Sequence, residues 1–170
     1  MRSGRTPREP PAPPDARETY AKAVDALARR AFSSAELRRW LEQRGHPRAN
    51  TDEAIERLTG LGYLDDAAYA LAFARSRVRT HGMSRRRLQG ELARRGVARE
   101  LVTAAIAAIF EDGEVDERAM CEAAAARKLR SLASLPRDVR LRRLQAFLIR
   151  RGHATHLIRE TVAQLARDGD

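Results

Sequence analysis

Apolar residues recur at helical spacing in three similar segments of the chain. Each segment contains two leucines four positions apart, followed by an arginine–glycine pair. The three sets are Leu37, Leu41 and Arg44-Gly45; Leu88, Leu92 and Arg95-Gly96; and Leu144, Leu148 and Arg151-Gly152. Two more apolar positions follow each glycine in the same register: Ile55 and Leu58, Ile106 and Ile109, and Val162 and Leu165. Matching registers of this kind are typical of tandem repeats, so the sequence predicts a unit that occurs three times.

Each repeat is expected to contain three helices, whose ends are set by capping residues and glycines. Ser33 and Glu36 have the spacing of a capping box, in which each side chain accepts a hydrogen bond from the other residue's backbone amide. A glycine just after a helix, such as Gly45, accommodates the left-handed backbone that ends it. In the first repeat we expect a helix over 20–30, a second that starts at Ser33 and a third that is opened by Asn50 with Glu53. In the second repeat we expect a helix capped by Asp65 or Asp66, a helix over 85–95 capped by Ser84, and a helix over 98–110. In the third repeat the expected helices are 116–131, 137–151 and 155–167.

These helices predict an all-α fold of three tandem three-helix repeats, which form an elongated, curved array with a disordered N-terminal tail. The expected boundaries are a tail and helix lead-in over 1–18, and repeats over 19–64, 65–113 and 114–170. Residues 1–14 hold five of the seven prolines among mixed charges. Such a segment buries too little apolar surface to offset its ordering entropy, although a polyproline ligand is an alternative interpretation.

Composition favours a helical protein of the cytoplasm. Aromatic residues make up only 5% of the chain, which is dominated by good helix formers such as Leu, Ala, Arg and Glu. The one cysteine, Cys121, excludes an internal disulfide framework, suits a reducing compartment and is expected to be a small buried hydrophobe. No apolar run approaches the roughly 20 residues that span a bilayer. The N-terminus lacks an apolar segment of the signal-peptide type. We therefore expect a cytoplasmic protein with no membrane partner.

No pattern along the chain indicates catalysis. The histidines, His46, His81, His153 and His156, form no HExxH motif, and no cysteine pair accompanies them. A solvated loop and first helical turn is the expected setting of His153 and His156, rather than a metal site. Glycine-rich phosphate loops are also absent from the sequence. We therefore expect a protein that is not an enzyme, with no catalytic residue, no metal and no cofactor.

The charge balance is strongly basic. The net charge is +10, and nearly all of the positive charge is arginine, because Lys22 and Lys128 are the only lysines. A basic excess raises affinity for phosphate backbones through long-range attraction and counterion release. The alternative is a high-GC genome, whose codons favour Arg and Ala in any protein. The positions of the arginines have to decide between these interpretations.

The arginines of the second and third repeats occur in register. Leu88 and Leu92 mark the core side of one helix, so its exposed side carries arginines around a small residue, Gly90, for which the third repeat has Ala146. A backbone or phosphate could come close to so small a residue. Gly90 costs its helix about 1 kcal/mol relative to alanine, so a reason for its presence is worth seeking. A solvated arginine-rich surface is the alternative. The expected phosphate-binding residues are the pairs Arg86 and Arg142, Arg87 and Arg143, Arg94 and Arg150, and Arg95 and Arg151, with Arg75 and Arg79 on the preceding helix.

A short element between the first two repeats carries a family resemblance. Gly62-Tyr63-Leu64-Asp65-Asp66, followed by Tyr69-Ala70 and Phe73, resembles the signature of the RecX family of bacterial recombinase regulators. The segments Ser33-x2-Glu36-Leu37, Glu91-Leu92-x2-Arg95-Gly96-Val97 and Phe147-Leu148-x2-Arg151-Gly152 are similar to its repeat motifs. Trp40 stands where the family usually has a basic residue, and His153 where it usually has an aromatic one.

The same element is expected to form a joint between the first two repeats. Gly62 would close one helix, Tyr63 and Leu64 would be buried, and Asp65 or Asp66 would cap the next helix. Such a joint would fix the angle between the repeats. A direct contact with a partner is the alternative role for these residues.

The resemblance implies a modulator, usually an inhibitor, of the RecA recombinase, acting in recombination, DNA repair and the SOS response. Family members are taken to lodge along the RecA–single-stranded DNA filament and to hinder its extension, ATP hydrolysis and co-protease activity. The implied partners are the RecA filament and single-stranded DNA, with double-stranded DNA as a further candidate, and we expect a monomer. The alternative is a general basic DNA-binding protein that acts directly on nucleic acid.

Overall fold

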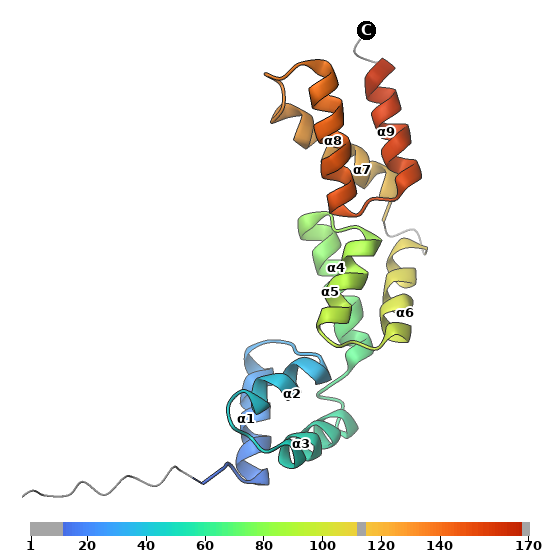
Figure 1. Cartoon of the computed structure of the whole chain (residues 1–170). Helices are drawn as coiled ribbons and strands as arrows, with labels where there is room; N and C mark the ends of the chain where they lie inside the picture. The colour runs from blue at the N-terminus through green and yellow to red at the C-terminus, as the bar shows by residue number, and fades with distance from the viewer. Residues whose placement is uncertain (1–11, 112–114, 168–170) are drawn as a thin grey trace, which may run out of the picture. The chain divides into compact units, whose positions relative to one another are not determined.

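The chain is helical throughout the part that the structure describes. The computed structural model describes residues 12–111 and 115–167, and over these ranges it contains nine α-helices and no strand (Figure 1). The helices are α1 (Ala16–Arg29), α2 (Ser34–Glu42), α3 (Arg48–Gly60), α4 (Asp66–His81), α5 (Arg85–Arg94), α6 (Arg99–Phe110), α7 (Glu117–Arg130), α8 (Arg137–Arg151) and α9 (Thr155–Arg167). The chain divides into two compact units, Met1–Asp65 and Asp66–Asp170. The predicted all-α fold is confirmed, and most of the predicted tail, residues 1–11, lies outside the described residues.

The first unit is built around the two leucines of its middle helix, α2. Leu37 and Leu41 are fully buried, in one cluster with Ala23 of α1 and Leu58 of α3. Their spacing of four places both side chains on the same face of α2. Burying a leucine stabilises the fold by roughly 1.5–3 kcal/mol. Because isolated helices of this length are marginal in water, the shared core is what holds α1, α2 and α3 together.

The second unit contains two more sets of three helices with the same arrangement. Leu88 and Leu92 of α5 are fully buried in a cluster shared with α4 and α6. Leu144 and Leu148 of α8 are fully buried in a cluster shared with α7 and α9. The predicted repetition of the leucine pair is therefore also a repetition of the core.

Each middle helix ends in the same hydrogen-bonded turn. The glycine of each arginine–glycine pair has a positive φ, +85° at Gly45, +78° at Gly96 and +79° at Gly152. The next residue donates its backbone N–H to the carbonyl of the second leucine: His46 to Leu41 at 3.3 Å, Val97 to Leu92 at 3.2 Å and His153 to Leu148 at 3.3 Å. This bond is the long-range bond of the Schellman motif, which satisfies carbonyls that the helix itself leaves unpaired. The predicted helix stops are confirmed.

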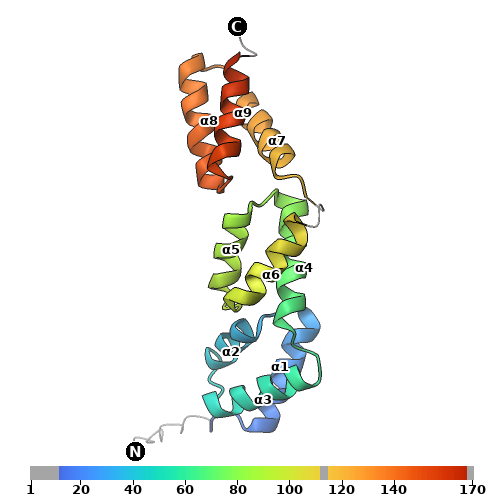
Figure 2. The ribbon, with the colours of Figure 1, turned by 90° about the vertical axis from the view of Figure 1, so that its right-hand side faces the viewer.

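The start of α5 lies against the end of α8 within the second unit (Figure 2). Ser84 occupies the N-cap position of α5 but makes no side-chain capping bond. Its hydroxyl instead donates to the backbone carbonyl of Arg151 at 2.7 Å, so the prediction that the Ser84 side chain caps its own helix is wrong. The reason is that the last carbonyls of a helix lack donors within it, and a neighbouring hydroxyl supplies one. An ion pair between Arg85 and Glu117 at 2.8 Å adds a second link between these two helix sets.

Two helices of the first unit begin earlier than predicted. α1 begins at Ala16 rather than at residue 20, because Asp15 and Glu18 form a complete capping box that the prediction overlooked. α3 begins at Arg48, directly after Pro47, so Asn50 does not cap it. The side-chain amide of Asn50 donates instead to the backbone carbonyl of Pro14 at 3.0 Å.

The segment that follows α3 buries only one of its two predicted residues. Leu64 is 2% exposed and belongs to the core of the first unit, whereas Tyr63 is 69% exposed. Both donate their backbone N–H groups to the carbonyl of Leu58, at 2.9 Å from Tyr63 and 3.2 Å from Leu64. This tight turn directs successive side chains to different sides, so the predicted burial of Tyr63 is wrong. Asp65 precedes the first residue of α4, and the role of the element as a joint stays a prediction.

Replacing Gly152 with alanine is expected to destabilise the protein more than the same change at Gly45. A Cβ at Gly45 would have nothing within 4 Å, so Gly45→Ala reports the strain of a positive φ alone, roughly 1–2 kcal/mol. A Cβ at Gly152 would lie 2.8 Å from Ser84 Oγ and 3.4 Å from Arg86 Cβ. Gly152→Ala should therefore cost about 1 kcal/mol more, through the disturbed Ser84 hydrogen bond. Urea unfolding measures both variants, and equal costs would mean that this hydrogen bond contributes no stability.

Single alanine substitutions at Tyr63 and Leu64 should separate their roles. Leu64→Ala removes a buried side chain and is expected to lower the free energy of unfolding by about 2–4 kcal/mol. Tyr63→Ala changes an exposed side chain and should stay within about 0.5 kcal/mol of the wild type. Thermal or urea unfolding tests both. A large loss of stability in Tyr63→Ala would contradict the exposure seen in the structure.

Candidate functional site

The described ranges contain neither a cluster of metal-ligating side chains nor a helix that could span a membrane. Over residues 12–111 and 115–167, no three His, Cys, Asp or Glu side chains come together so that they could hold a metal ion. No helix in these ranges is long and apolar enough to cross a membrane. Cys121 is buried as expected, its sulfur lies 3.6 Å from the Thr161 hydroxyl, and burial raises the pKa of its thiol. A buried thiol with a raised pKa is a poor nucleophile.

His153 differs from its prediction, because it is buried rather than solvated. It is 9% exposed, and it occupies the position of the buried Val97 in the preceding repeat. Burial lowers the pKa of His153, and the positive charge of Arg151 lowers it further. Its Nε2 atom has no hydrogen-bond partner among the described residues. The repeated turn after the glycine therefore places this side chain inward whatever its polarity.

The predicted arginines of α5 lie on its exposed side. Arg86 and Arg87 are exposed in the first turn, and Arg94 is exposed in the last. Arg87 also lies 3.5 Å from Glu91, one turn along the same helix, so part of its charge is neutralised. A Cβ on Gly90 would meet only Arg94 Nη1, at 3.9 Å, which is an ordinary van der Waals distance. Packing within the described chain therefore does not require a glycine at this position.

The equivalent arginines of α8 are exposed as well. Arg142 and Arg143 lie in the first half of the helix, and Arg150 lies in its last turn. Arg151 is partly buried, and its guanidinium donates to the backbone carbonyl of His81 at 2.6 Å. The repeated pattern in the sequence therefore corresponds to a repeated basic surface, in which Arg151 is held in place more firmly than its neighbours.

The structure brings the arginines at the start of α5 close to those at the end of α8, whereas the other predicted arginines of these two helices lie farther away. A Cβ on Gly152, at the end of α8, would lie 3.4 Å from Arg86 Cβ and 3.7 Å from the backbone nitrogen of Arg87. The first turn of α5 and the last turn of α8 therefore form one basic junction. Arg94 lies at the far end of α5 and Arg142 lies near the middle of α8, each on the order of 12 Å from this junction along its helix axis. The arginines of α5 and those of α8 therefore do not lie side by side along the whole length of the two helices.

In all three repeats the arginine before the glycine stacks on an aromatic ring. The guanidinium carbons lie over the ring of Trp40 for Arg44 at 3.8 Å, of Phe73 for Arg95 at 4.5 Å, and of Phe147 for Arg151 at 5.4 Å. Such cation–π contacts hold a charged side chain in one orientation. The arginine of this motif therefore has a packing role in every repeat, besides any role in binding.

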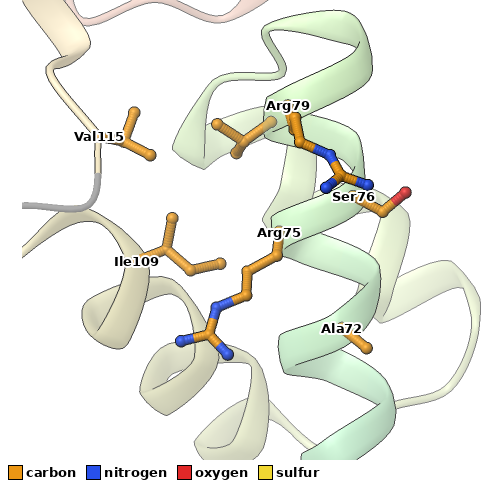
Figure 3. A pocket seen from close by; sticks show the side chains of 7 residues that line it. Ala72, Arg75, Ser76, Arg79, Ile109 and Val115 are labelled. Atoms are coloured by element: carbon orange, nitrogen blue, oxygen red, sulfur yellow. The ribbon is translucent and has the colours of Figure 1, made fainter.

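Arg75 and Arg79 line a cleft between α4 and α6. The cleft has a volume of about 480 Å³, and its lining includes Ser76, Ile109 and Val115. Figure 3 shows the two arginines projecting from α4, with the apolar side chains of Ile109 and Val115 across from them. We call this the α4 cleft. Its arginines come from α4 alone, so both of the predicted residues on that helix belong to one surface feature.

One candidate residue was missed by the sequence interpretation. Arg127, near the end of α7, lies close enough to Arg151 for its charge to lower the pKa of that guanidinium. Arg127, Lys128 and Arg130 make a basic last turn in α7, and this run was the available signal. The end of α4 is basic as well, with Arg79 and His81 in its last turn.

Comparison with known proteins adds a family to this geometry. Three family models match in order along the chain: the first three-helix domain of RecX over residues 20–58, the second over 65–106 and the third over 116–162. The chain is 36% identical to a protein of Amycolatopsis mediterranei described as regulatory protein RecX, over 94% of this chain and 91% of that one. It is 32% identical to a protein of the same description from Streptomyces coelicolor, over 95% of this chain and 85% of that one.

Two crystal structures show the same fold. A structure of regulatory protein RecX matches 86% of this chain with a TM-score of 0.74 and 17% identity, over 72% of its own length. A structure of RecX from Lactobacillus salivarius matches 89% of this chain with a TM-score of 0.74 and 14% identity, over 96% of its own length. At these identities the likeness concerns the arrangement of the helices alone.

Substituting Gly90 with alanine tests whether a ligand comes close to α5. Because a Cβ fits at this position, Gly90→Ala should raise the free energy of unfolding by about 1 kcal/mol. The reverse change at the equivalent position of α8, Ala146→Gly, should lower it by a similar amount. Urea unfolding measures both, and DNA affinity is measured beside it. If Gly90→Ala is stabler but binds DNA as the wild type does, no phosphate rests against this glycine.

Proposed function

The chain belongs to the RecX family of regulatory proteins, and we propose that it modulates the RecA recombinase by binding the RecA–single-stranded DNA filament. The expected effect is inhibition, through limited filament extension, ATP hydrolysis and co-protease activity. The proposal includes no chemical step on the part of this chain. We also propose that it acts in the cytoplasm as a monomer.

The observation that carries the proposal is the complete set of three RecX three-helix domains, in order over residues 20–162. The relatives that share this set over most of the chain are described as regulatory proteins. A protein with several small helical repeats can contact more than one subunit of a polymer at once. Several weak contacts then add to a strong one, because each bound repeat raises the effective concentration of the next.

The distribution of charge supports a partner that includes nucleic acid. Arg86, Arg142, Arg143 and Arg150 are exposed, and the net charge of the chain is +10. Exposed arginines attract phosphates at long range and release counterions when they bind them. The same surface favours the second candidate function, in which the protein binds DNA directly and does not require RecA. The two functions differ in whether RecA must be present.

A RecA ATPase assay on single-stranded DNA distinguishes the two functions. If the protein acts on the filament, substoichiometric amounts should slow ATP hydrolysis even when free DNA is in excess. A DNA-binding protein that only competes for the template should lose its effect as more DNA is added. Unchanged ATP hydrolysis at every protein concentration would refute the proposed modulation of RecA.

Neutralising the repeated arginines should weaken filament binding without unfolding the protein. The variant R86Q/R87Q/R94Q and the variant R142Q/R143Q/R150Q should each lose affinity, and the combination should lose more. These side chains are exposed, so each change should alter stability by no more than about 0.5 kcal/mol. If the arginines meet single-stranded DNA phosphates, each lost contact should flatten the log–log salt dependence of affinity by about 0.7.

The control for this experiment removes the same charge from the first unit. R17Q/R29Q/R48Q changes three exposed arginines on helices that lack the repeated pattern. Equal losses of affinity in the control and the two test variants would mean that only the net charge matters. Binding of naked DNA, measured in the same salt series, shows whether the lost contacts were to DNA or to RecA.

A further inference from the structure

A second basic cleft lies within the second unit, between the end of α4 and the helices α7 and α8. Its volume is about 460 Å³, and its lining includes Arg79, His81, Arg127 and Arg151. The described residues that line it include three arginines and no aspartate or glutamate. We call it the junction cleft. One of its arginines comes from α4 and two come from α7 and α8, so the cleft exists only when the two helix sets of the second unit are in contact.

The arginines of the junction cleft differ from others nearby in lacking acidic partners. Arg85, on the neighbouring α5, pairs with Glu111 at 3.2 Å and with Glu117 at 2.8 Å. Over residues 12–111 and 115–167, neither Arg79, Arg127 nor Arg151 forms an ion pair. The positive charge of the cleft is therefore left uncompensated by the described part of the chain.

Arg151 is held by its contacts at a position where its charge and that of Arg127 repel each other. Arg151 donates to the backbone carbonyl of His81 at 2.6 Å and lies over the ring of Phe147. Arg127 Nη2 lies 3.9 Å from where a Cβ on Gly82 would be. Burial lowers the pKa of Arg151, and the charges of Arg127 and Arg87 lower it further. An anion bound between these groups would relieve the repulsion and replace lost solvation.

The junction cleft is continuous with the α4 cleft along one helix. Val78 and Arg79 line both of them. Arg75, one turn before Arg79, lines the α4 cleft only, whereas Arg127 and Arg151 line only the junction cleft. Two adjoining basic clefts suit a ligand whose negative charges repeat along its length. A nucleic-acid strand is such a ligand, and an isolated small anion is not.

We propose that Arg79, Arg127 and Arg151 form a binding pocket for a phosphodiester group of a nucleic-acid strand, which continues from there into the α4 cleft. Each guanidinium presents a planar fork of donors that matches phosphate oxygens. Guanidinium groups from three helices can approach the oxygens of a tetrahedral phosphate from different sides, whereas the two oxygens of a carboxylate lie in one plane. This inference extends the proposed function by naming a site for the nucleic acid. It rests on the proposed function only because it takes nucleic acid as a ligand.

Binding of labelled oligonucleotides to the full chain tests the pocket without RecA. The probes are an oligothymidine single strand and a hairpin duplex, measured by fluorescence anisotropy over a salt series. Arg79→Gln and Arg127→Gln should each weaken binding of at least one probe by about tenfold, and should flatten the salt slope by about 0.7 on the single strand or about 0.9 on the duplex. Arg127→Lys should recover only part of the affinity, because it keeps the charge and loses the fork. The probe with the larger loss identifies the strand form.

The matched control is Arg130→Gln, which removes an exposed arginine from the same turn of α7 but does not line the cleft. It should change affinity by less than about twofold, as expected for a charge that only contributes to the general field. Arg151 is left unchanged, because its bond to His81 links the two helix sets. Circular dichroism confirms that each variant is folded.

Two outcomes would overturn the inference. In the first, Arg79→Gln and Arg127→Gln have the same affinity for both probes as the control Arg130→Gln. In the second, they bind both probes normally but lose affinity for DNA-free RecA, which would assign the cleft to an acidic protein surface. In either case the RecA ATPase assay with the wild-type chain remains a separate test, so failure of the pocket is distinguishable from failure of the proposed function.

Discussion

The burial of two leucines in the middle helix of each repeat is the interaction on which the rest of the structure depends. Leu37 and Leu41, Leu88 and Leu92, and Leu144 and Leu148 are all fully buried. The first helix of each set contributes alanines to the core, such as Ala23, Ala70 and Ala124, so the leucines of the middle helix supply much of its apolar volume. Without the leucine pair no set would bury enough apolar surface to offset the entropy of ordering three helices. The glycine turn that follows each pair then returns the chain to the same core.

The same constraint decides where the charges can lie. With one face of α5 committed to Leu88 and Leu92, arginines on that helix have to occupy the remaining surface. Contacts in the second unit then make a single basic junction from parts of two repeats. Ser84 and Arg151 bond across 67 residues of sequence, and this bond places the first turn of α5 beside the last turn of α8. The proposed phosphate pocket adjoins this contact.

The sequence predicted the parts of the structure that depend on neighbours along the chain. The capping box of Ser33 and Glu36 is present, and the helix expected over 137–151 matches α8, because both depend on residues within one or two turns. The starts of α1 and α3 were misplaced for local reasons too, through the overlooked Asp15 cap and the effect of Pro47. The exposed arginines of α5 and α8 were predicted by position on the helix, whereas their function stays a prediction.

The sequence by itself determined the repeat, the helices, the leucine cores and the family resemblance, because helical periodicity and helix caps depend on residues that are close together in the chain. Only the tertiary structure decided which partner Ser84 takes, that His153 is buried, and that Arg127 joins Arg79 and Arg151 around one cleft. Each of these depends on how one helix end meets another. A contact between helix ends depends on the packing of whole helices, so it produces no pattern of residues at fixed spacing along the chain.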